Sequence, residues 1–159
     1  MLLCAITIQG CSVKYSFTGG SIPEGMKTVS VLFFENSAPQ VVPTLSNDFT
    51  EALKERIRNQ SSLSQVNSDG DAIFEGRITG YSITSSAVEG NTNRAALNKL
   101  TITVQVKYTN QIKPDDSFEQ SFSRFQEFSG DVQSREQGLI KEINTMLTED
   151  IYNRAFANW

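Results

Sequence analysis

The stretch Leu100-Thr101-Ile102-Thr103-Val104-Gln105-Val106-Lys107-Tyr108-Thr109 decides the fold class of this chain, because its apolar and polar side chains alternate without a break. Successive side chains of an extended strand point to opposite faces of a sheet. The even-numbered members therefore predict a face that is buried in a core, and the odd-numbered members predict a face turned to solvent. This pattern indicates a half-buried strand of a sheet that is covered on one side.

Working outward from this strand, four further segments have the composition of strands: Thr28–Phe34, Leu63–Val66, Ala72–Ile83 and Phe118–Phe128. The third alternates, but its apolar positions change phase between Ile78 and Tyr81, which predicts a β-bulge near Gly80. In the last segment Phe125 is out of phase with Phe128, and the pattern again predicts a slip of phase within the strand.

Two segments carry helical periodicity. The first is expected from about Leu45 to Asn59, capped by Thr44 or Ser46, with one apolar stripe: Leu45, Phe49, Leu53 and Ile57. The second is expected to start near Ser134, which forms a capping box with Gln137. Its apolar face is Leu139, Ile140, Ile143, Met146, Leu147 and Ile151. The order β-α-β-β-β-α predicts an α+β domain, with two helices packed on one face of a four- to five-stranded mixed or antiparallel sheet.

The beginning of the chain points to a lipid anchor. Residues 1–10 are apolar and uncharged, and Ile8-Gln9-Gly10 stands directly before Cys11. This arrangement resembles a bacterial lipobox, in which the cysteine is acylated and becomes the new N-terminus. The resemblance implies that residues 1–10 are a remnant of a signal peptide, and that residues 11–26 are a lipidated N-terminus and tether. The alternative is that Leu2–Ile8 forms an ordinary first strand with buried thiols.

The composition argues against several classes of protein. The chain contains no histidine, and no cysteine follows Cys11, so the usual catalytic base and the common zinc ligands are missing. Its net charge of −4 gives no basic excess for nucleic acid. Carboxylate pairs such as Asp115 and Asp116 fall in expected turns or on an exposed helix face, where solvation explains them. We therefore expect no enzyme activity, no cofactor and no metal site.

Taken together, these segments resemble the LptE family of lipopolysaccharide-assembly lipoproteins, in particular its Bacteroidetes-type versions. The resemblance spans nearly the whole chain and rests on these parts: Cys11–Phe17, Lys27–Val31, Leu45–Leu53, Phe122–Phe125 and the last helix. It implies a single LptE-like domain over residues 27–159, anchored in the outer membrane on the periplasmic side or inside a barrel lumen. It also implies an LptD-type β-barrel as partner and lipopolysaccharide as cargo.

Other small envelope lipoproteins share this order of elements. The alternative function is therefore a stand-alone envelope lipoprotein that binds a ligand or serves as a subunit of a secretion or surface complex. If the family resemblance holds, phosphates of lipopolysaccharide need cations beside apolar surface. The candidates at one end of the sheet are Arg94, Lys99 and Arg135, the last of these in the first turn of the closing helix. The alternative for all of them is a solvated surface charge.

Overall fold

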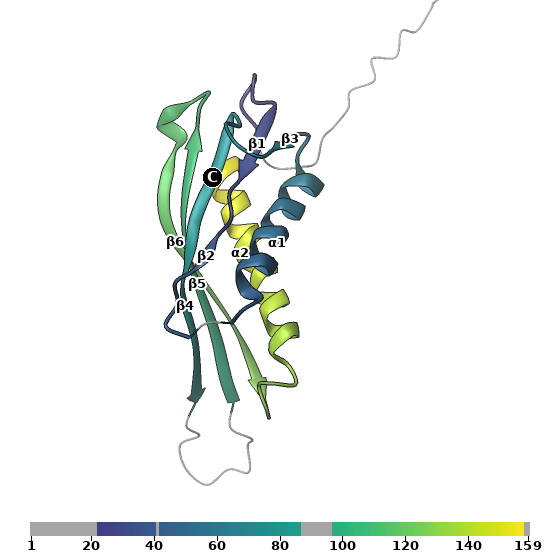
Figure 1. Ribbon diagram of the computed structural model, residues 1–159, viewed down its shortest axis with the longest axis vertical. Coiled ribbons are helices and arrows are strands. Elements are labelled where there is room, and N and C mark those ends of the chain that lie inside the picture. The colour runs from purple at the N-terminus through teal and green to yellow at the C-terminus, as the bar shows by residue number, and fades with distance from the viewer. Residues whose placement is uncertain (1–21, 41, 87–96, 158–159) are drawn as a thin grey trace, which may run out of the picture.

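A computed structural model describes residues 22–40, 42–86 and 97–157. It is an α+β fold in which helices α1 (Leu45–Gln60) and α2 (Glu136–Phe156) lie side by side on one face of a mixed sheet (Figure 1). The predicted fold class and the placement of both helices on one face are confirmed.

The described residues form one six-stranded sheet in the order β3-β1-β4-β5-β6, with β2 also paired to β4. Its strands are β1 (Thr28–Val31), β2 (Glu35–Asn36), β3 (Ser64–Val66), β4 (Ala72–Ser86), β5 (Leu97–Asn110) and β6 (Phe118–Ser129). The three long strands β4, β5 and β6 are antiparallel, whereas β1 and β2 run parallel to β4. A 3-10 turn, Pro114–Asp116, connects β5 to β6.

The run Thr28–Phe34, expected as one strand, is divided between β1 and the loop before β2. Val31 pairs with Phe74 and Glu35 pairs with Arg77, so this side of the ladder holds one residue more than β4 does. The interruption turns Phe34 into the core with no exposed surface and leaves Phe33 59% exposed. The backbone N–H of Phe34 no longer joins a ladder and donates to Thr50 Oγ1 of α1, at 3.1 Å.

One of the two predicted irregularities in the long strands is present. The register between β4 and β5 shifts between Ile78 and Gly80, as the change of apolar phase predicts. The slip expected in the last strand is wrong, because β6 pairs with β5 in one unbroken register. Phe125 therefore points to the face opposite Phe128, and it is 51% exposed while Phe128 is buried.

Both helices match the predicted stripes, but neither helix start has the side-chain capping bond that was predicted. Thr44 is the N-cap of α1 by position and makes no side-chain capping bond. The capping box at Ser134 is wrong, because Arg135 occupies the N-cap of α2. The hydroxyl of Ser134 instead donates to the carbonyl oxygen of Asp131, at 3.1 Å, in the turn before the helix.

One apolar core joins the two layers. The even-numbered side chains of β5 are buried in the same cluster as the inward side chains of α2: Leu100, Ile102, Val104, Val106 and Tyr108 with Leu139, Ile140, Ile143, Leu147 and Ile151. The predicted alternation of β5 is therefore confirmed. Met146, expected in the helix stripe, is only partly buried at its margin.

Asp71, in the turn before β4, forms hydrogen bonds with the start of β1. Its carboxylate accepts hydrogen bonds from the backbone N–H groups of Lys27, at 2.8 Å, and Thr28, at 2.9 Å, and from the Thr28 hydroxyl. These bonds favour the charged form, so they hold the pKa of Asp71 below its ordinary value. Asp71 thus joins the turn before β4 to the start of β1.

Candidate functional site

The face of the sheet away from the helices is polar along most of its length. Outward side chains of β4, β5 and β6 carry hydroxyl groups: Ser82, Thr101, Thr103, Ser121 and Ser123. Thr103 Oγ1 and Ser123 Oγ lie 3.0 Å apart across the β5–β6 ladder. The outer face of the sheet thus carries many hydrogen-bonding groups.

Lys99 and Phe125 interrupt this polar face near the end of the sheet where β4 ends and β5 begins. We call these two residues the Lys99–Phe125 patch. The ammonium nitrogen of Lys99 lies 4.9 Å from the centroid of the Phe125 ring. Lys99 pairs with Glu127 across the ladder, and Thr101 pairs with Phe125, so both side chains stand on the outer face. A cation therefore lies directly beside exposed apolar surface, as a contact with a phosphorylated lipid requires.

Arg135 lies at the same end of the molecule but on the helix side of the sheet. It is exposed and directly precedes α2, whose first residue, Glu136, accepts a hydrogen bond of 2.6 Å from the Tyr81 hydroxyl. Burial and this carboxylate raise the pKa of Tyr81 well above its usual range. Because Tyr81 points to the inner face, the sheet stands between Arg135 and the Lys99–Phe125 patch.

The structure thus separates two of the three predicted cations instead of gathering them. Arg94 and Cys11 lie outside the described residues, so neither has a structural position to compare. Sequence reasoning missed Phe125 as a surface residue because it expected a slip of phase within the last strand. Its odd number, against the even numbers of Phe118, Phe122 and Phe128, was the available signal.

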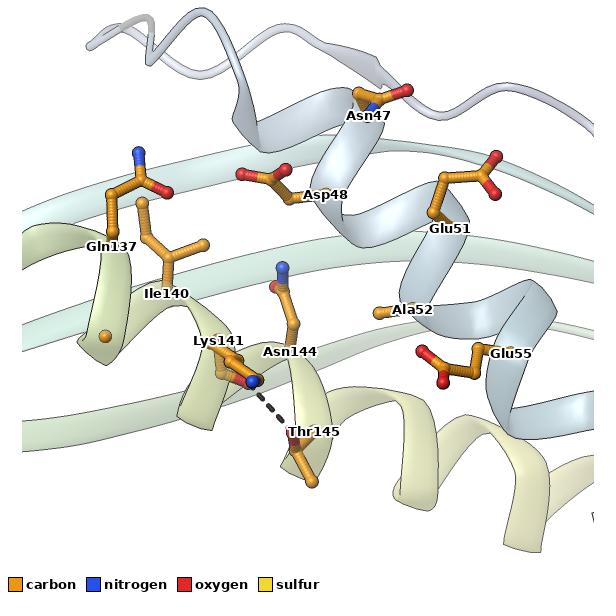
Figure 2. A pocket seen from close by; sticks show the side chains of 11 residues that line it. Asn47, Asp48, Glu51, Ala52, Glu55, Gln137, Ile140, Lys141, Asn144 and Thr145 are labelled. Carbon is orange, nitrogen blue, oxygen red and sulfur yellow. Dashed lines mark hydrogen bonds between the residues drawn. The ribbon is translucent and has the colours of Figure 1, made fainter. Parts of the chain in front are cut away.

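A groove between α1 and α2 is a second feature that the sequence did not reveal (Figure 2). It has a volume of about 550 Å³. Asp48, Glu51 and Glu55 line it from α1, and Lys141 and Asn144 line it from α2. The spacing of the three carboxylates along one helix face was readable from the sequence, but their position above a hollow was not.

The described residues place limits on other kinds of site. Within them, no group of three or more His, Cys, Asp or Glu side chains is arranged to hold a metal ion. Neither α1 nor α2, the helices of the described ranges, is long and apolar enough to cross a bilayer.

Comparison with solved structures finds similar folds among bacterial proteins, several of which are named lipoproteins. A minor lipoprotein from Acinetobacter baumannii is 14% identical, with a TM-score of 0.54, covering 81% of this chain and 91% of that one. The rare lipoprotein B from Shewanella oneidensis is 18% identical, with a TM-score of 0.52, covering 80% and 92%. The PelC dodecamer from Paraburkholderia phytofirmans is 12% identical, with a TM-score of 0.51, covering 87% and 95%. At these identities the likeness establishes the fold alone.

Sequence comparisons add the family. No curated protein matches the chain by sequence. The family model described as LptE, lipopolysaccharide-assembly, matches residues 26–155, which include every helix and strand of the described structure except the last residue of α2. The chain therefore belongs to the LptE family of lipopolysaccharide-assembly proteins.

Proposed function

We propose that this protein is an outer-membrane lipoprotein that partners an LptD-type β-barrel in the transport and assembly of lipopolysaccharide. The observation that carries the proposal is the family match over residues 26–155. The role is one of binding and assembly, and it requires no catalytic group. The two-layer fold supports it by presenting a broad polar sheet face for contacts outside the chain.

The proposal includes acylation of Cys11, motivated by Ile8-Gln9-Gly10 before it. A single acyl chain holds a protein only marginally, whereas two or more give stable anchoring. Intact-mass spectrometry of protein isolated from membranes tests this directly. The expected product starts at Cys11 and carries the added mass of acyl chains. Mature protein that retains Met1–Gly10, or an unmodified Cys11, contradicts the anchor.

The partner is tested by solubilising outer membranes in mild detergent and isolating the full chain by an affinity tag. We expect a large β-barrel to co-purify in a fixed ratio, and depletion of the chain to leave that barrel misassembled. A chain that purifies alone, with the barrel unaffected by its loss, refutes the partnership. That result favours the alternative, a stand-alone envelope lipoprotein or a subunit of another envelope complex.

We further propose that lipopolysaccharide contacts the Lys99–Phe125 patch. The ammonium group supplies charge for a phosphate, and the exposed ring supplies apolar surface for an adjacent acyl chain. Arg94 and Arg135 remain proposed phosphate ligands, with Arg135 at a helix N-terminus that favours anions. Solvation of all three cations is the competing explanation.

The test is lipopolysaccharide binding by the full chain carrying Lys99→Ala with Phe125→Ser. Lys107→Ala is the matched control, because Lys107 lies on the same strand and outer face but is paired with Glu75 at 2.6 Å. We expect the double variant to bind several-fold more weakly and the control to bind as the parent does. Separate Arg94→Ala and Arg135→Ala variants test the remaining two positions. Unchanged affinity in every variant, with the fold intact by circular dichroism, removes these side chains from the contact.

A further inference from the structure

The strand at one end of the sheet has a long unpaired edge. Among the described residues, β6 pairs with β5 alone and is the last strand of the sheet on that side (Figure 1). It has twelve residues, whereas β3, at the other end of the strand order, has three. The edge of β6 therefore presents a row of backbone N–H and C=O groups that can pair with another strand.

The register of the sheet identifies the residues whose backbone groups point to this edge. The N–H of Gln111 donates to the carbonyl oxygen of Asp71, at 2.8 Å, one step beyond the paired residues Ala72 and Asn110. Hydrogen-bonded pairs alternate along an antiparallel ladder, so odd-numbered residues of β5 bond to β4 and even-numbered ones bond to β6. The bulge near Gly80 lies in β4, so this alternation continues along β5. Because even-numbered residues of β5 pair with even-numbered residues of β6, the odd-numbered residues of β6 point their backbone groups away. These include Ser121, Ser123, Phe125, Glu127 and Ser129.

β6 does not have the features with which many proteins block an edge strand. It contains no proline and no lysine, and its register with β5 is unbroken, so no bulge bends it. Its only arginine, Arg124, bonds both carboxylate oxygens of Asp150 and is thereby directed toward α2. The chain after β6 turns toward β5, where the carbonyl oxygen of Gly130 accepts a hydrogen bond from the Asn98 amide, at 3.4 Å. These features suit β6 to the addition of a further strand.

The sequence of β6 is complementary to itself when two copies run antiparallel with a two-fold axis at Phe125. The opposing pairs are Phe125 with Phe125, Ser123 with Glu127, Ser121 with Ser129, Phe122 with Phe128 and Arg124 with Gln126. Each charged side chain in this stretch then stands opposite an uncharged polar one, and each aromatic ring stands opposite another ring. Aromatic pairs across a ladder are stabilising.

Neighbouring registers are less favourable. Axes one and two residues toward the N-terminus place Arg124 opposite its own counterpart or Glu119 opposite Glu127. Axes one and two residues toward the C-terminus place Glu127 opposite Phe125 or opposite its own counterpart. Like charges that stand directly opposite each other destabilise a pair of strands. Charge and the position of the exposed ring of Phe125 therefore select the same axis.

We propose that β6 pairs with β6 of a second copy of this chain, antiparallel and with the two-fold axis at Phe125. The two sheets then become one, and the odd-numbered residues of the two edges exchange backbone hydrogen bonds. A two-fold interface uses the same surface on both copies, so it requires the self-complementarity that β6 has. The inference goes beyond the proposed function, because it concerns the chain without any other protein.

Cysteine cross-linking tests the register. The background is the full chain in mild detergent with Cys4→Ser and Cys11→Ser, so that an introduced cysteine is the only thiol. A mixture of Ser123→Cys and Glu127→Cys chains should form disulfide-linked dimers under mild oxidation, because Cα atoms of such a pair lie about 5.5 Å apart. Ser121→Cys is the matched control on the same strand and face. Its two copies would lie about eight residues, or roughly 26 Å, apart along the ladder, so they should not link.

Sedimentation equilibrium tests the contact itself. Phe125→Glu brings two carboxylates together at the axis and should weaken self-association at least about tenfold. Phe33→Glu is the matched control, because Phe33 is likewise exposed but lies outside β6.

A second pair of variants acts on the backbone of the edge. Ser123→Pro removes an N–H group from the free edge and leaves the ladder with β5 intact, so it should also weaken self-association at least about tenfold. Ser123→Ala keeps this N–H group and should associate as the parent does. Circular dichroism of every variant checks that the monomer is folded.

Three results overturn the proposal. The first is a parent chain that sediments as a monomer at concentrations up to about 1 mM. The second is cross-linking of Ser121→Cys as efficient as that of the Ser123→Cys and Glu127→Cys mixture. The third is an equal effect of Phe125→Glu and Phe33→Glu on self-association. Because no readout involves lipopolysaccharide or a barrel, failure here leaves the proposed function standing.

Discussion

Replacing Ile143 by alanine tests whether α2 and the sheet share one core. Ile143 has no exposed surface and lies in the same cluster as Leu100 and Val104 of β5. Truncating a fully buried isoleucine to alanine costs about 2–5 kcal/mol, because both transfer free energy and packing against the cavity are lost. Alanine has the highest helix propensity, so the loss does not come from the backbone.

The magnitude translates into a thermal shift that is easy to measure. For a domain of this size, 1 kcal/mol changes Tm by roughly 2–4 °C, so Ile143→Ala should melt about 5–15 °C below the parent. Glu142→Ala is the control, because Glu142 is the neighbouring residue on the exposed side of α2 and should change stability by about 0.5 kcal/mol or less. Circular dichroism melts and urea titrations of the parent and both variants provide the comparison. Equal shifts in the two variants would refute the assigned orientation of the helix.

Three further predictions concern single contacts of the fold. Because hydrogen bonds hold the pKa of Asp71 below its ordinary value, its stabilisation is present above that value and is lost as pH falls through the folded-state pKa. Asp71→Asn should therefore melt below the parent at pH 7, with the gap closing as pH falls below the ordinary pKa of an aspartate, and a gap independent of pH contradicts this. The Arg124 guanidinium bonds both carboxylate oxygens of Asp150, at 2.6 and 2.7 Å, and joins β6 to α2. A double-mutant cycle with Arg124→Ala and Asp150→Ala should give a coupling of about 0.2–1 kcal/mol that falls with added salt, since the pair is partly exposed; zero coupling at low salt removes the link. A Cβ on Gly70 would stand 2.7 Å from a backbone nitrogen of β1, so Gly70→Ala should destabilise by about 1–3 kcal/mol in urea unfolding. Gly138→Ala, with open space around its Cβ, should be neutral or stabilising by up to about 1 kcal/mol, and a reversed order of these two variants contradicts the packing at Gly70.

The parts of the fold that were predicted correctly are those in which apolar residues recur with a regular spacing within one element. The alternation over β5 and the stripe Leu45, Phe49, Leu53 and Ile57 each repeat within a single element, so the sequence alone indicates which side is buried. The bulge near Gly80 was also predictable, because an extra residue shifts the parity of every apolar position that follows it. Helix starts were less accurate, since Ser134 had a competing partner in Asp131.

The sequence by itself determined the element types, the single α+β core and the order of helices and strands, because these follow from spacing between near neighbours. Only the tertiary structure decided that Phe125 lies outside with Lys99, and that Arg135 lies on the other side of the sheet. It also decided that Asn144, within the apolar stripe of α2, faces a hollow beside Asp48. The periodicity within one strand or helix separates its faces. Which face another element covers, and how completely, depends on packing between residues far apart in the chain.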